Sequence, residues 1–190
     1  WTGRVALGAL SLGLAVALSG PSALHAQANI GQAAPAFTLP DTKGVEHSLS
    51  QYAGKYVVLE WLNYDCPYVK KHYGGNNMQQ LQKAWTGKGV VWLTILSSAA
   101  GQQGHMDGAR ANAYFAQQNA APSAILLDPS GAIGRLYDAK TTPHMFVINP
   151  EGVLVYNGAI DDKPTSDTAD LATAFNYVSA ALTEGMAGKA

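Results

Sequence analysis

Hydrophobic residues gather in short runs that are separated by turns rich in glycine, proline and aspartate. The runs at 57–59 and 90–96 are almost uninterrupted and rich in Val, Leu, Ile and Trp, which predicts central strands buried on both faces. Shorter runs predict further strands at 37–39, 45–49, 124–127, 144–148 and 153–156. The segments between them predict a helical turn at 50–55, helices at 67–85, 109–118, 130–137 and 167–182, and a tail at 184–190.

The order of these elements is a β-hairpin, then alternating strands and helices, then a second hairpin and a final helix. It predicts an α/β domain with a central mixed β-sheet, helices on both faces and an N-terminal β-hairpin extension. Parallel strands joined by helices place their loops at the carboxyl edge of the sheet, where ligands bind in folds of this class. The only cysteine, Cys66, lies at that edge.

An apolar run at 5–18 follows Arg4 and is shorter than the roughly 20 apolar residues that a spanning helix needs. The small-x-small pattern Ala26-Gln27-Ala28 comes after it. These features predict a secretory signal peptide at 1–28, followed by one domain at 29–190. We therefore expect an exported, periplasmic or extracellular protein, which would be held at a membrane only if the signal stays uncleaved.

The chain is close to electrical neutrality, with 12 Lys and Arg residues against 13 Asp and Glu residues. A nucleic-acid-binding protein carries a basic field, so we expect no nucleic-acid partner. A single cysteine forms no internal disulfide. Cys66 is therefore a buried inert thiol, a partner in intermolecular chemistry or a metal ligand, and we expect no cofactor.

Cys66 lies where a buried strand gives way to a helical pattern. Pro67 suits the first position of that helix, because proline lacks the N–H group that would be unpaired there. The free N–H groups and the positive dipole at a helix N-terminus favour a thiolate. Lys70 and Lys71 add positive charge within about one turn, whereas the carboxylate of Asp65 opposes it. This position predicts a reactive thiol.

Three motifs resemble those of one family. Residues 31–61 resemble the opening of the redoxin group, in which an extended segment precedes a Gly-Lys-x-Val-Val-Leu strand. Cys66-Pro67 resembles the Cys-Pro site of such proteins, and Thr142-Pro143 resembles the Thr-cis-Pro that faces the reactive cysteine in thioredoxin-fold proteins. The chain from about residue 30 to residue 182 thus resembles the redoxin family, the alkyl hydroperoxide reductase and thiol-specific antioxidant superfamily. The resemblance implies a thioredoxin-like fold.

The resemblance also implies roles for the neighbours of Cys66. Glu60, six residues earlier, matches the buried acid of thioredoxins that exchanges a proton with the active site. Burial would raise its proton affinity, unless it is an edge residue with access to water. His72 is a second candidate for proton transfer. The candidates for substrate binding are Asn63, Pro67, Thr142, Pro143 and His144.

Val69 stands where thioredoxin-type oxidoreductases have their second cysteine. Without that thiol, a mixed disulfide at Cys66 has no internal group to release it. We therefore expect an external partner, either a low-molecular-weight thiol or a redox protein, to complete each cycle.

The chain also departs from the peroxiredoxin pattern Pro-x-x-x-Thr-x-x-Cys, because Leu59 and Asn63 occupy the proline and threonine positions. Asn63 retains the ability to donate a hydrogen bond. Pro143 stands where the activating arginine of that family would align. The sequence leaves open whether Arg110 or Arg135 comes close to the thiol in three dimensions.

These observations predict an exported monothiol oxidoreductase whose Cys66 thiolate attacks a peroxide or a disulfide. An alternative is a copper or zinc carrier on the same fold, because Cys66, His72 and His144 would together offer one thiolate and two imidazoles. A third possibility is a binding module that keeps the fold and has lost the chemistry.

Overall fold

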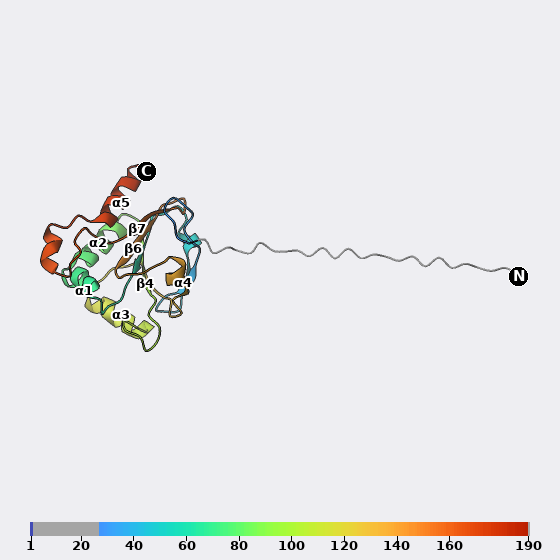
Figure 1. Cartoon of the computed structure of the whole chain (residues 1–190), viewed down its shortest axis with the longest axis horizontal. Helices are drawn as coiled ribbons and strands as arrows, with labels where there is room; N and C mark the ends of the chain where they lie inside the picture. The colour runs from blue at the N-terminus through green and yellow to red at the C-terminus, as the bar shows by residue number, and fades with distance from the viewer. Residues whose placement is uncertain (2–26, 190) are drawn as a thin grey trace.

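A five-stranded mixed sheet forms the centre of the fold (Figure 1). The computed structural model describes Trp1 and residues 27–189, so the predicted signal peptide at 1–28 lies almost wholly outside the described residues. The strands are β3 (Val57–Trp61), β4 (Val91–Leu96), β5 (Ala124–Leu127), β6 (His144–Ile148) and β7 (Leu154–Gly158). They lie in the order β5-β4-β3-β6-β7, with β3, β4 and β5 parallel and β6 antiparallel to both of its neighbours, β3 and β7. The predicted mixed sheet is confirmed.

The predicted N-terminal hairpin is also present. It consists of β1 (Thr38–Pro40) and β2 (Glu46–Ser48), followed by the 3₁₀ helix η1 (Leu49–Tyr52). The hairpin forms its own two-stranded sheet, and a single bridge between Asp41 and Leu126 joins it to β5. Phe37 and Leu39 fix it in place, because both side chains are buried in the core on this side of the main sheet.

Helices cover both faces of the main sheet (Figure 1). Four of them, α1 (Pro67–Gly74), α2 (Asn77–Thr86), α3 (Gly108–Gln117) and α5 (Tyr177–Met186), lie on one face. On the other face, α4 (Ala132–Leu136) packs beside the N-terminal hairpin. Successive strand residues serve the two cores in turn: Val58 and Trp92 pack toward the four helices, and Leu59 packs toward α4.

The single helix predicted at 67–85 is wrong, because the chain breaks between α1 and α2. Asn76 has a φ of 57°, in the left-handed region, and no α-helix continues through such a residue. Asparagine tolerates this conformation, and Gly74 and Gly75 before it weaken the end of α1. The break lets α1 and α2 pack on the sheet as separate pieces.

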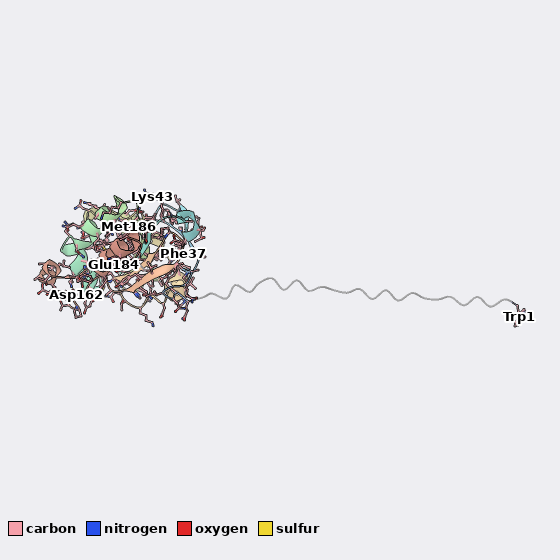
Figure 2. The ribbon with its side chains drawn as sticks, turned by 90° about the horizontal axis from the view of Figure 1, so that it is seen from above. Trp1, Phe37, Lys43, Asp162, Glu184 and Met186 are labelled. Carbon is pink, nitrogen blue, oxygen red and sulfur yellow. The ribbon has the colours of Figure 1, made fainter. Side chains whose placement is uncertain are left out.

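The final helix is also shifted from its predicted range of 167–182. Residues Thr168–Ala172 form the 3₁₀ helix η2, and α5 runs from Tyr177 to Met186, into the expected tail. Between them, Asn176 forms a β-bridge with Asp161, and the N–H group of Phe175 donates to Asp162 at 2.8 Å. Figure 2 shows Asp162 on the side of the domain opposite to Phe37. The segment from β7 to α5, which includes η2, packs against α1.

Candidate functional site

Cys66 is the N-cap residue of α1, and Pro67 is the first residue of the helix, as the sequence predicts. Its backbone N–H donates to the carbonyl of Asn63 at 3.0 Å, which closes the turn after β3. The half-buried thiol donates a hydrogen bond to the carbonyl oxygen of Thr142 at 3.0 Å. The peptide bond between Thr142 and Pro143 is cis. The structure therefore brings the Cys-Pro and Thr-Pro motifs together.

A cavity of about 1000 Å³ opens beside the thiol. Its wall includes Cys66, Pro67, His72, Thr142, Pro143 and Asp161. A water molecule takes about 30 Å³ of liquid volume, and hydrogen peroxide is only slightly larger. The cavity therefore has room for an organic molecule next to the sulfur.

Both lysines that were expected to support a thiolate are paired with carboxylates. The exposed Lys70 ammonium lies 3.5 Å from Asp65. Lys71 is buried, and its Nζ donates to the carbonyl of Lys163 at 3.2 Å and lies 3.6 Å from Oδ2 of Asp161. Each positive charge is therefore largely balanced before it can act on Cys66.

His72 lines the cavity from α1 and is only 2% exposed. Burial lowers its pKa to about 4, and the positive charge of Lys71 adds to this although Asp161 opposes it. The side-chain amide of Asn77 lies 2.8 Å from Nδ1, and Nε2 lies 3.7 Å from Asp161. At neutral pH His72 is an uncharged imidazole, with Nδ1 accepting from Asn77 and the N–H of Nε2 directed toward Asp161.

Glu60 is fully buried on the face of β3 that packs against α1 and α2, so it is not an edge residue with access to water. Burial raises its pKa, as the sequence analysis expects. Its oxygens accept four hydrogen bonds of 2.8–3.1 Å, from Tyr73, Gln82, Trp92 and Thr94. Within residues 27–189, no hydrogen bond joins Glu60 to Cys66 directly.

Asn63 supports the turn before the thiol. Its Oδ1 accepts from the backbone N–H of Asp65 at 2.9 Å, and its Nδ2 donates to the carbonyl of Gln103 at 3.4 Å. The amide also lines the cavity. Asn63 therefore ties the loop after β4 to the turn, and its amide is not hydrogen-bonded to the sulfur.

His144 lies on β6, half-buried, with its ring 4.5 Å from that of Phe146. Its Nδ1 accepts from the backbone N–H of Lys140 at 3.3 Å, and its Nε2 donates to Oδ1 of Asn157 at 2.8 Å. Burial lowers its pKa. Both ring nitrogens are therefore occupied. Across residues 27–189, no three His, Cys, Asp or Glu side chains are grouped so as to hold a metal ion, so the structure does not assemble Cys66, His72 and His144 into one centre.

The sequence left open whether Arg110 or Arg135 comes close to the thiol, and neither of them does. The guanidinium of Arg110 stacks on the ring of Tyr64, with its central carbon 4.6 Å from the ring centre, and donates to the tyrosine hydroxyl. Arg135 donates to the carbonyl of Ser130 at 3.0 Å. Among residues 27–189, no arginine lines the cavity.

Two further residues, Asp161 and Trp61, belong to the site. Asp161 lies just beyond β7 and has a side chain that is only 4% exposed, yet an aspartate in a polar loop carries no sequence signal of burial. Trp61, the last residue of β3, is buried and also lines the cavity. Its indole N–H donates to Ser97 at 3.0 Å, and Ser97 donates to the buried Asp128 at 2.7 Å. This chain fixes the end of β3 from the far side of the sheet.

Comparison with known proteins gives a family model and several solved structures. The model of the AhpC/TSA family matches residues 30–157. A hypothetical protein from Sinorhizobium meliloti is 24% identical, with a TM-score of 0.67 over 86% of this chain and 87% of that one. A candidate thiol:disulfide interchange protein DsbE from Chlorobium tepidum is 26% identical, with a TM-score of 0.60 over 82% and 99%.

A third structure is the exposed lipoprotein thioredoxin Etrx1 of Streptococcus pneumoniae. It is 24% identical, with a TM-score of 0.53 over 73% of this chain and 96% of that one. No curated protein matches the chain. These likenesses confirm the thioredoxin-like fold expected from the family resemblance. Over the part of the chain that the structure describes, no helix has the length and apolar content to cross a bilayer.

Proposed function

Because the chain belongs to the AhpC/TSA family, we propose that it is an exported monothiol oxidoreductase that exchanges disulfides through Cys66. The observation that carries this proposal is the cavity shared by Cys66 and the cis-proline Pro143. It is much larger than a peroxide needs, and no arginine from the described part of the chain lines it. Both features favour a disulfide over a peroxide as the substrate.

The reaction begins when the Cys66 thiol loses the proton that it donates to Thr142. The thiolate attacks one sulfur of a substrate disulfide, forms a mixed disulfide and releases the other sulfur as a thiolate. A second, external thiolate then attacks the mixed disulfide, leaves as part of a new disulfide and returns Cys66 to its thiolate form. The external partner is required because Val69 occupies the position of a second cysteine and is fully buried in the core.

His72 and Glu60 differ in how they fit proton transfer. His72 lines the cavity and Glu60 does not, so of the two only His72 borders the space in which a proton would be exchanged. Glu60 is enclosed by its four donors, so we assign it to holding α1, α2 and β4 around the turn that carries the thiol.

The test is to treat the purified chain with an oxidised peptide disulfide and to follow the mixed disulfide by intact mass. We expect an adduct that an added thiol removes, with continued turnover as long as thiol is present. Cys66→Ser should form no adduct. A matched series with hydrogen peroxide separates the two reactions. Thiol-dependent loss of peroxide without disulfide exchange would show a peroxidase instead of the proposed enzyme. If the protein carries out neither reaction, it is a binding module without catalytic activity.

Export is supported by the signal-like sequence at 1–28 and by likeness to an exposed lipoprotein thioredoxin. We expect residues 1–28, fused to alkaline phosphatase in a bacterial host, to give phosphatase activity outside the cytoplasm. A fusion that begins at residue 29 is the matched control. Equal activity of the two fusions would contradict export by this segment.

A further inference from the structure

Two exposed tyrosines lie in the wall of the cavity beside Cys66. Tyr68, in the first turn of α1, is 44% exposed, and Tyr177, the first residue of α5, is 37% exposed. Both residues line the same cavity as the thiol. An apolar group that covers these rings removes apolar surface from water, so the rings favour such a group in whatever enters the cavity.

Contacts between α1 and the segment after β7 hold this part of the wall in place. The hydroxyl of Tyr68 donates to the carbonyl of Pro164 at 3.4 Å, and the backbone N–H of Tyr177 donates to the carbonyl of Ile160 at 3.0 Å. Beneath them, Nζ of the buried Lys71 donates to the same segment. The two tyrosines are therefore presented by a wall that is already formed when a substrate arrives.

The charges around the cavity are balanced in pairs. Within the part of the chain that the structure describes, four charged residues line the cavity, and each has an opposite charge within 3.7 Å: Lys140 with Asp138, Asp161 with Lys71, and Asp162 with Lys163. His72 is uncharged at neutral pH. A charged group on a substrate thus meets charges that are already neutralised, whereas an uncharged apolar group gains contact with the two rings.

Part of this wall lies outside the region that the chain shares with its family. The AhpC/TSA model matches residues 30–157, which include Cys66 and Pro143. Residues 159–164 and Tyr177 line the cavity from the chain beyond that match. The shared region therefore supplies the thiol and the cis-proline, and the added wall is the part suited to set which substrate this chain accepts.

The size of the cavity indicates how much of a substrate it holds. Its volume of about 1000 Å³ is at the upper end of the range for pockets that hold a whole organic ligand. It therefore has room for a cysteine together with a neighbouring side chain. Tyr68 follows Cys66 by only two residues, so a group that packs on its ring belongs to a residue close to the reacting sulfur.

We propose that the substrate is a polypeptide disulfide with an aromatic residue within two positions of its cysteine, and that this residue packs on Tyr68 and Tyr177. This inference rests on the proposed function, because it names the substrate class of the same exchange. In the step concerned, the Cys66 thiolate forms a bond to one substrate sulfur, the bond between the two substrate sulfurs breaks, and the second sulfur leaves as a thiolate. The aromatic residue takes no part in this exchange and only holds the substrate.

The experiment uses symmetric disulfides of acetylated and amidated pentapeptides with the full chain. The reference is Gly-Gly-Cys-Gly-Gly, and Phe, Leu, Glu or Lys replaces one glycine at a time. Formation of the adduct at Cys66 is followed by intact mass. Each rate is divided by the rate of the same peptide disulfide with 2-mercaptoethanol, an uncharged thiol, which removes differences in the intrinsic reactivity of the disulfides.

We expect Phe in at least one position to exceed the reference by about fivefold to tenfold after this correction, and Glu and Lys to stay within about twofold of it. Equal rates for Phe and the reference at every position would overturn the proposal, and so would a charged peptide that reacts faster than every Phe peptide. An equal gain with Leu would overturn the assignment to an aromatic residue. Failure of Cys66 to react with any disulfide, including 2-hydroxyethyl disulfide, would instead contradict the proposed function.

The double variant Tyr68→Ser/Tyr177→Ser should lower the ratio of the Phe rate to the reference rate to about one, because both rings are lost. Phe175→Ser is the matched control. This exposed ring lies 5.6 Å from that of Tyr177 but is not among the residues that line the cavity, so the ratio should be kept. A ratio that the double variant leaves unchanged would overturn the assignment to the two tyrosines. The peptide series on the wild-type protein decides the proposal even if the variant does not fold.

Discussion

His72 is a histidine that the folded protein holds without charge. Its pKa is lowered to about 4 by burial, whereas histidine in an unfolded chain titrates near 6.5. Between these values the unfolded state binds more protons than the folded state, so the free energy of unfolding falls as the pH drops through this window. Below about pH 4 both states are protonated, and the contribution of His72 is already lost.

We therefore predict that His72→Gln flattens the pH dependence of stability. Between about pH 7.5 and pH 4.5, the wild-type protein should lose about 2 to 3 kcal/mol more than the variant, as urea unfolding would measure. The raised pKa of Glu60 acts in the opposite direction, since its contribution is present at low pH and is lost as the pH rises. This contribution of Glu60 is the same in the wild-type protein and in the variant, so it cancels when their two pH profiles are subtracted. Parallel profiles would show that His72 titrates normally.

At the scale of elements, the loop between β4 and α3 supports the turn that carries the thiol. Gly104 has a φ of 80°, and a Cβ there would lie 2.3 Å from the side chain of Asn63. Gly101, in the same loop, has a φ of 78° and an open environment. The two glycines thus share a backbone conformation and differ in what an added Cβ atom would contact.

This pair gives a matched prediction. Gly101→Ala should cost about 1 to 2 kcal/mol, which is the penalty for a side chain in the left-handed region. Gly104→Ala should cost about 1 to 3 kcal/mol more, because Asn63 must move. Only Gly104→Ala should also change the rate at which iodoacetamide alkylates Cys66. Equal costs and equal alkylation rates in the two variants would show that Asn63 does not position the turn.

Elements were predictable from sequence where a hydrophobic run had a clear end. Strands β5 and β6 lie at their predicted residues, because each run is bounded by turn-forming residues. The helix after Cys66 was predicted as one piece because apolar residues recur on both sides of the break, although Gly74, Gly75 and Asn76 are the sequence signal for it. The start of α5 has a local signal in Asn176, whose side chain accepts from the N–H of Ser179, beside a hydrogen bond from Phe175 to Asp162 that local pattern does not contain.

At the scale of the whole molecule, Glu60 joins the sheet to the helices. Glu60→Leu would leave four buried donors on α1, α2 and β4 without an acceptor, and we predict a loss of about 3 to 5 kcal/mol in urea unfolding. Thr94→Val removes one donor and keeps the carboxyl group, so it should cost only about 1 kcal/mol. Similar losses in the two variants would mean that the network contributes little beyond packing.

The site was predictable to the extent that its residues belong to short motifs. Cys66, Pro67, Thr142 and Pro143 were identified by Cys-Pro and Thr-Pro, and the structure brings them together. The pairing of Lys71 with Asp161 was not predictable, because a lysine on a helix is usually exposed and this one is buried only by a segment about 90 residues later. Local sequence describes the thiol and its helix, whereas tertiary packing decides the charges around them.

The hydrogen bond from Cys66 to Thr142 spans 76 residues of sequence. At synthesis rates of about 5 to 20 residues per second, the cysteine precedes its partner by roughly 4 to 15 seconds. Asp161, which also lines the cavity, follows later still. During that interval the nascent chain presents a thiol without its pocket, so its first encounters with other disulfides are governed by timing and surroundings rather than by the specificity of the finished site.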